Sequence, residues 1–127
     1  MNKFIKMSQV MLLMLAMGAA HAQISSVTNV ITPSAPTDWS SKNSNDVVTI
    51  NNGTGNLLTI TITVTKPATS QPNPAGVNIN NCGDTKHIDA GSTAICTTND
   101  SNNPVNFSSD SQTDAASGTY VIAQNPA

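Results

Sequence analysis

The chain has 127 residues, of which 9% are charged, and its five lysines and seven acidic residues give a net charge of −2. All seven acids are Asp, Arg does not occur, and only three lysines follow residue 22, so residues 23–127 carry a net charge of −4. Nucleic acids and anionic membrane surfaces are bound through basic side chains. We therefore expect neither to be a partner of this segment.

The first 22 residues have the features of a cleavable secretory signal peptide. Lys3 and Lys6 give a positive start, residues 10–17 form an unbroken apolar run, and residues 20–22 present the Ala-x-Ala pattern that a signal peptidase reads. The apolar run is too short to cross a bilayer, which needs about 20 residues. The alternative is a short buried helix, but the order of these features predicts export with cleavage after Ala22.

Cleavage would leave residues 23–127, the size of a single ordinary domain. This segment has no second long apolar run, so we expect it to be soluble, without membrane insertion, in the periplasm, at the cell surface or outside the cell. Its large apolar residues are nearly all Val and Ile, which favour strands. We expect no cofactor.

The predicted elements begin with a candidate strand at residues 24–31 and a loop at 33–45 that carries Trp39. Residues 46–50 form a second short strand. The Asn- and Gly-rich turn at 51–56 then predicts a hairpin between this strand and the next one.

The clearest strand runs from Leu57 to Thr65, where apolar residues alternate with threonines over eight positions. This period of two predicts one face in the core and a solvent-facing row formed by Thr59, Thr61, Thr63 and Thr65. A proline-rich loop follows at 67–74. Further short strands are predicted at residues 76–80, 86–89, 92–96, 105–107 and 119–123.

Two cysteines occur in the chain, Cys82 and Cys96. In an exported protein, an isolated pair predicts a structural disulfide. A redox pair would usually show the spacing Cys-x-x-Cys, and a zinc site needs about four ligands, whereas only His87 is near the two thiols in sequence.

Residues 114–122, which contain the sequence Gly-Thr-Tyr ending at Tyr120, resemble the start of the penultimate strand of immunoglobulin-like domains. Residues 88–95 resemble a turn and strand of bacterial immunoglobulin-like modules. The resemblance covers about the last 40 residues. It implies an all-β, immunoglobulin-like sandwich of about seven short antiparallel strands with one disulfide. No cysteine follows Tyr120 at the second position, so a disulfide of the antibody kind between the sheets is not implied.

The resemblance also implies that the last strand is missing, because only seven residues follow Tyr120. A sandwich that lacks a strand exposes an apolar groove and open backbone edges, which a strand from another subunit can fill. Residues 23–31 have the length and apolar content of such an exchangeable strand. The alternative is that this segment pairs within its own domain.

Little in the sequence indicates catalysis. His87 could be combined with Asp89 and a serine, but no Gly-x-Ser-x-Gly motif accompanies them, and a surface histidine near a turn is the simpler interpretation. Asp100, Asp110 and Asp114 are weak calcium candidates, because their spacing is not that of a known calcium loop. No other metal site is predicted.

The threonine row at Thr59, Thr61, Thr63 and Thr65 is a candidate binding face for ice or carbohydrate, although threonine is also an ordinary solvent-facing strand residue. Taken together, the sequence predicts an exported, non-enzymatic structural or adhesive protein of a bacterial surface or matrix. Such a protein could be a filament subunit that binds copies of itself by strand exchange. The alternative is a monomeric periplasmic or secreted module that binds a protein or glycan.

Overall fold

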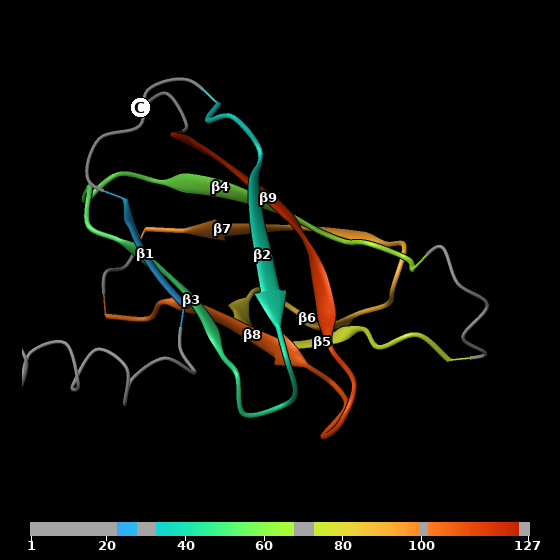
Figure 1. Ribbon diagram of the computed structural model, residues 1–127. Helices are drawn as coiled ribbons and strands as arrows, with labels where there is room; N and C mark the ends of the chain where they lie inside the picture. Colours follow the sequence, from blue (N-terminus) through green and yellow to red (C-terminus); the bar gives the residue numbers. More distant parts are fainter. Residues whose placement is uncertain (1–22, 28–32, 68–72, 100–101, 125–127) are drawn as a thin grey trace, which may run out of the picture.

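The computed structural model describes residues 23–27, 33–67, 73–99 and 102–124 (Figure 1). The predicted signal peptide, residues 1–22, lies outside the described residues, as do residues 28–31 of the predicted first strand. In the part that is described, no helix has the length and apolar character needed to span a membrane.

The described residues form nine strands and no helix. The strands are β1 (Gln23–Val27), β2 (Thr37–Ser41), β3 (Val48–Asn52), β4 (Leu58–Val64), β5 (Val77–Cys82), β6 (Thr85–Ile88), β7 (Thr93–Thr98), β8 (Val105–Ser109) and β9 (Ala116–Gln124).

The strands form two sheets (Figure 1). Sheet A has the order β1-β3-β8-β5-β6, and sheet B has the order β2-β9-β4-β7. Every neighbouring pair is antiparallel except β1 and β3, which run parallel over five residue pairs. The predicted all-β sandwich is confirmed, with nine described strands in place of about seven and with one parallel pair.

The hairpin expected between residues 46–50 and 57–65 does not form. The corresponding strands belong to different sheets, β3 to sheet A and β4 to sheet B. Both strands bury apolar side chains in the same core, but they do so from opposite sheets and are not neighbours in one sheet. The buried Asn52 secures the connection, since its side-chain amide donates to the carbonyls of Asn56 (2.7 Å) and Thr98 (2.9 Å).

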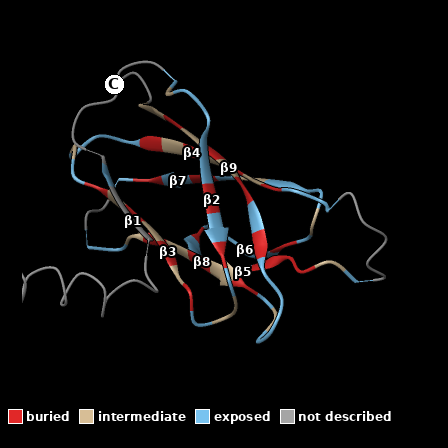
Figure 2. Cartoon of the chain, in the orientation of Figure 1, coloured by how far each residue is buried: buried red, intermediate tan, exposed pale blue. Residues whose placement is uncertain are grey.

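The core lies between the two sheets and is mainly aliphatic (Figure 2). Sheet B contributes Leu58, Ile60, Ile62 and Val64, all fully buried, as the period of two in β4 predicts. Sheet A contributes the buried side chains of Val48, Ile50, Val77, Ile79, Val105 and Phe107. Burying such side chains is the main source of folding free energy in a domain of this kind.

The segment predicted as a loop at 33–45 contains a strand, β2. Its central residue, Trp39, is 3% exposed and packs edge-on against Phe107, with 5.0 Å between the ring centroids. The indole N–H of Trp39 also donates to the carbonyl of Thr119 (3.2 Å). The buried aromatic ring therefore anchors β2 in the sandwich. The sequence around it has no alternating apolar pattern that would have predicted a strand.

The strand that contains Tyr120 has a neighbour on each side, so the expected vacancy beside it is filled. β2 pairs antiparallel with β9 from Thr37↔Tyr120 to Ser41↔Ala116, and β4 pairs with the other edge of β9. The open edge expected beside this strand is therefore not present, because the chain supplies the neighbour from its N-terminal part and not from a segment after Tyr120.

The structure explains why position 118, the first residue of the Gly-Thr-Tyr sequence, is a glycine. A Cβ atom at this position would collide with the carbonyl oxygen of Thr63 and approach the ring of Trp39. Glycine therefore lets β9 lie close to β4 on one side and to the Trp39 ring of β2 on the other.

Candidate functional site

The predicted threonine row lies on the outer face of sheet B. Thr59, Thr61 and Thr63 are half-buried and Thr65 is exposed, while the residues between them are buried. The register of β4 is therefore the one that the sequence predicts.

The neighbouring strands widen this row into a face of three strands. Thr97, Ile95 and Thr93 of β7 pair with Thr59, Thr61 and Thr63 of β4. On the other side, the same three threonines pair with Ala123, Val121 and Thr119 of β9. We call these nine residues the threonine face. The sequence shows only its central row, because the outer two rows depend on the pairing of distant segments.

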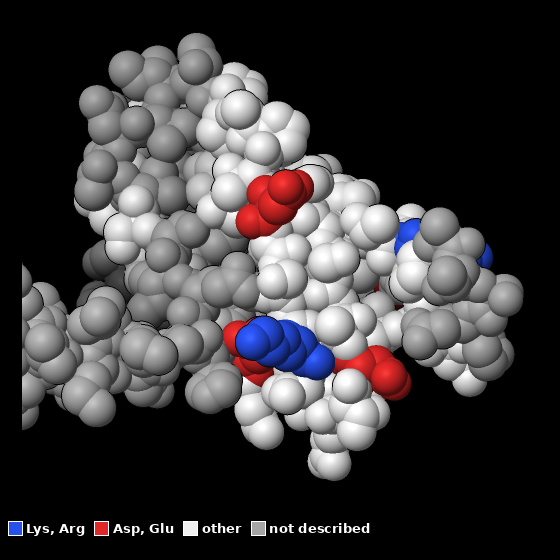
Figure 3. Space-filling model, in the orientation of Figure 1, with Lys and Arg blue, Asp and Glu red and all other residues white. Residues whose placement is uncertain are grey.

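The threonine face offers hydroxyl and methyl groups and no charge. The hydroxyls of Thr63 and Thr93 lie 3.1 Å apart and hydrogen-bond across the two strands. In the view of Figure 3, uncharged side chains cover most of the described surface, and charge is limited to a few Lys and Asp residues. Such a surface suits a neutral partner better than an ionic one.

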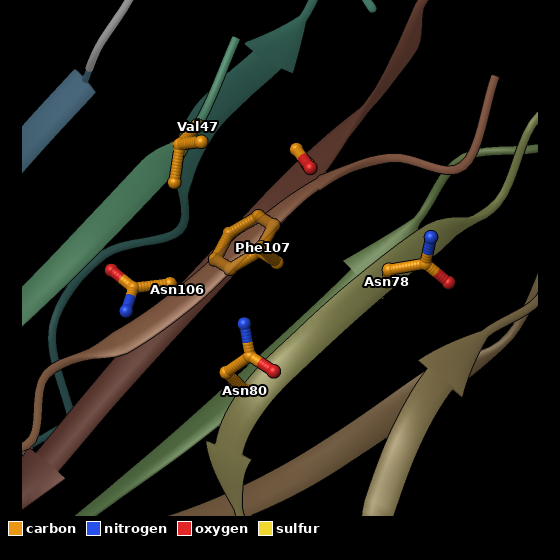
Figure 4. Close-up of a pocket in the computed structure, with 6 residues that line it drawn as sticks. Val47, Asn78, Asn80, Asn106 and Phe107 are labelled. Atoms are coloured by element: carbon orange, nitrogen blue, oxygen red, sulfur yellow. The ribbon is translucent and has the colours of Figure 1, made fainter. Parts of the chain in front are cut away.

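A shallow hollow of about 80 Å³ lies on the outer face of the other sheet (Figure 4). Three asparagines line it, Asn78 and Asn80 from β5 and Asn106 from β8. Val47, Ser108 and the buried Phe107 complete the lining. The cross-strand register explains the cluster, because Asn80 pairs with Asn106 and Asn78 pairs with Ser108.

Hydrogen bonds already orient part of this hollow, which we call the asparagine hollow. The hydroxyl of Thr49 donates to the side-chain oxygen of Asn106 (2.9 Å), and the amide nitrogen of Asn106 donates to the carbonyl of Pro104 (3.3 Å). Asn78 and Asn80 are exposed. Each carboxamide can donate and accept hydrogen bonds, as a sugar hydroxyl or a peptide group requires of its partner. Sequence analysis missed this site, whose only local signal is the spacing of Asn78 and Asn80 by two residues.

His87 lies between two carboxylates. Its Nε2 is 2.8 Å from Asp110 Oδ2, and its Nδ1 is 3.3 Å from Asp89 Oδ1. The contacts that the structure gives for both ring nitrogens are therefore carboxylate oxygens and not a serine hydroxyl. The arrangement connects β6 to the loop after β8 and does not have the geometry of a catalytic triad.

Two of the three calcium candidates, Asp110 and Asp114, lie in the described part of the chain, and both make other contacts there. Asp110 accepts from the backbone N–H of Gly76 (3.2 Å) in addition to its contact with His87. Asp114 accepts from the hydroxyl of Ser111 (3.1 Å), and Asp100 lies outside the described residues. Among the residues that the structure describes, no three His, Cys, Asp or Glu side chains are placed to hold a metal ion.

The predicted disulfide is present and joins the two sheets. Cys82 ends β5 of sheet A, Cys96 is in β7 of sheet B, and both are buried. The cross-link therefore holds an edge strand of sheet B against sheet A, a connection between the sheets that the immunoglobulin-like resemblance did not imply.

We expect this disulfide to stabilise the folded protein by roughly 2–4 kcal/mol, mainly by restricting the unfolded chain. Urea unfolding of the oxidised protein and of the double variant Cys82→Ala/Cys96→Ala measures the difference. Alkylation of the unfolded but unreduced protein should add no mass. Labelling of two thiols in protein purified from the periplasm or medium would contradict the assignment.

Comparison with known proteins identifies no family for this chain. No protein-family description matches it, and no curated protein is significantly similar in sequence. What is established is therefore the class of protein, an all-β sandwich with one disulfide between its sheets.

Proposed function

We propose that the chain is an exported, non-enzymatic structural or adhesive protein of a bacterial surface or matrix, with an immunoglobulin-like sandwich, whose subunits join by exchanging their N-terminal strand. The observation that carries this proposal is the position of β1. It begins at Gln23, the first residue after the predicted cleavage site, and it lies at the edge of sheet A with β3 as its single neighbour in the sheet.

The pairing of β1 can be transferred to a second subunit unchanged. Within one chain, β1 and β3 pair from Gln23↔Val48 to Val27↔Asn52. A β1 strand from another copy would make the same five pairs, so the exchange loses no hydrogen bonds. The protein concentration and the length of the segment between β1 and β2 then decide whether β1 pairs within its own chain or with another copy. Exchange in one direction along a row of subunits produces an open filament, whereas mutual exchange produces a closed dimer.

The second candidate function is a monomeric module that binds a protein or a glycan. The asparagine hollow favours it, because the exposed carboxamides of Asn78 and Asn80 lie beside the oriented Asn106. Hydrogen bonds from such amides can recognise neutral sugar hydroxyls or a peptide backbone.

Two measurements test the strand exchange. Residues 23–127 should form polymers whose size increases with concentration. Deletion of residues 23–31 should abolish these polymers and leave a chain that a synthetic 23–31 peptide stabilises against heat. The peptide restores a row of backbone hydrogen bonds to the free edge of β3. A peptide of the same composition in scrambled order is the control. A full-length chain that sediments as a monomer at all concentrations would exclude exchange and favour the binding module.

A cysteine pair keeps the test informative if the deletion variant fails to fold. Ser26 pairs with Asn51 across β1 and β3, and neither residue is buried. After oxidation, Ser26→Cys/Asn51→Cys should give a ladder of covalent oligomers on a non-reducing gel if β1 is exchanged. Cross-linking only within single chains would contradict the proposal.

A further inference from the structure

The four edges of the two sheets differ in how well they are protected against pairing with another strand. Natural sheets protect open edges with charged residues, prolines and bulges. β6 carries Lys86 and His87, and its pairing with β5 contains an irregularity, while β2 carries Asp38 and follows Pro36. The remaining edge of sheet A is the N-terminal strand β1.

β7, the remaining edge of sheet B, has none of these protective features. Its sequence, Thr-Ala-Ile-Cys-Thr-Thr, contains no charged residue and no proline. It pairs with β4 over six consecutive residues without a bulge, and β4 also carries no charge. β7 is therefore a regular, uncharged template for a further strand.

An exposed apolar side chain lies at the middle of this edge. Ile95 is 66% exposed, and it projects from the outer face of β7 between Thr93 and Thr97, which are also exposed. The other large apolar side chain with high exposure among the described residues is Leu57, at 41%. An exposed isoleucine in an open edge strand without charges makes this edge suited to pairing with another strand.

We propose that β7 pairs antiparallel with β7 of a second copy around a two-fold axis at Ile95, so that sheet B continues from one molecule into the other. A strand is its own complement in this arrangement, because Ile95 meets Ile95 of the second copy and Thr93 meets its Thr97. Residues 23–127 carry a net charge of −4, so two copies repel each other in general. Contact through β7 reduces this repulsion, because neither β7 nor its neighbour β4 contains a charged residue.

The disulfide makes β7 a firm template. Cys96 points inward and is bonded to Cys82 of the opposite sheet, while Ile95 next to it points outward. The strand is therefore held in its extended form before a partner arrives, which lowers the entropy lost on pairing. The dimer would also join the two threonine faces into one continuous surface.

This contact is independent of the exchange of β1, because β1 belongs to the other sheet. Ile95→Lys should weaken the dimer by about tenfold or more, since it removes the apolar contact and places two ammonium groups opposite each other. Leu57→Lys is the matched control, because it makes the same change at an exposed apolar residue outside β7. Sedimentation equilibrium over a range of concentrations measures both, and thermal melting confirms that both variants fold.

A cysteine placed on the two-fold axis gives a second, direct measurement. Ile95→Cys should form a covalent dimer under mild oxidation, because a residue on the axis meets its own copy, whereas Leu57→Cys should form no covalent dimer. Two results together would exclude the β7 contact and identify β1 exchange. Oligomers would persist in Ile95→Lys, and deletion of residues 23–31 from the chain with wild-type β7 would leave only monomers. A strictly monomeric wild-type chain, or equal cross-linking of the two cysteine variants, would also overturn the proposal.

Discussion

Ile60→Asp is expected to prevent the domain from folding. Ile60 is fully buried in the middle of β4, where it pairs with Cys96 of β7 and Ile122 of β9. A carboxylate at this position would have apolar neighbours, and burying an unpaired charge costs far more than burying a neutral polar group. Small domains are stable by only roughly 5–15 kcal/mol, so this one change can exceed the whole margin.

The adjacent variant Thr61→Asp is the matched control. Thr61 lies on the threonine face between Ile95 and Val121, and its side chain is half-buried. The new carboxylate can reach water there, so the loss should be small, about 1 kcal/mol or less. Urea unfolding followed by circular dichroism compares the two variants. Equal damage would show that a partner covers the threonine face, and the reverse order would show that the register of β4 is shifted by one residue.

The sequence predicts β4 well because this strand separates its two environments by residue type. Its inward residues are aliphatic and its outward residues are all threonine, so the period of two is visible without any knowledge of the neighbours. The disulfide could be predicted for a similar reason. Two cysteines allow one intramolecular pairing, and the expected oxidising compartment favours it.

β2 could not be recognised because a polar residue takes one of its inward positions. Ser41 is fully buried, and its hydroxyl donates to the carbonyl of Asp46 (2.6 Å) and accepts the N–H of Ser109 (2.8 Å). The Asp46 side chain in turn accepts the N–H of Lys42 (2.8 Å). Such a network makes a polar residue stable in the interior, but its link from Ser41 to Ser109 spans 68 residues, so no local pattern shows it.

The pairing of strands was the other part that local patterns could not supply. The turn at 51–56 has the composition of a hairpin, yet it connects the two sheets, and β3 and β4 contribute apolar side chains to the core from opposite sheets. The asparagine hollow and the outer rows of the threonine face depend in the same way on which distant strands become neighbours. The outward orientation of the threonines in β4 was therefore predictable, whereas the two rows beside them were not.

Trp39→Ala is expected to destabilise the protein by roughly 3–5 kcal/mol, the usual cost of deleting a large buried aromatic side chain. The change removes the edge-on contact with Phe107 and the hydrogen bond to the carbonyl of Thr119. It also removes the side chain that holds β2 against β9. Urea unfolding measures the loss, and Asp38→Ala, an exposed neighbour on the same strand, should change the stability by about 0.5 kcal/mol or less.

The same variant tests whether β2 is what closes the edge of β9. If the Trp39 ring anchors β2, Trp39→Ala should increase the hydrogen-exchange rate of the amides in residues 116–120 more than that of the other amides of sheet B. The reason is that this edge would open locally before the domain unfolds. The freed edge should then promote association, since unpaired strand edges recruit other strands. An equal increase in the exchange rate across the whole sheet would contradict this prediction. It would show that Trp39 stabilises the core as a whole and does not specifically anchor β2.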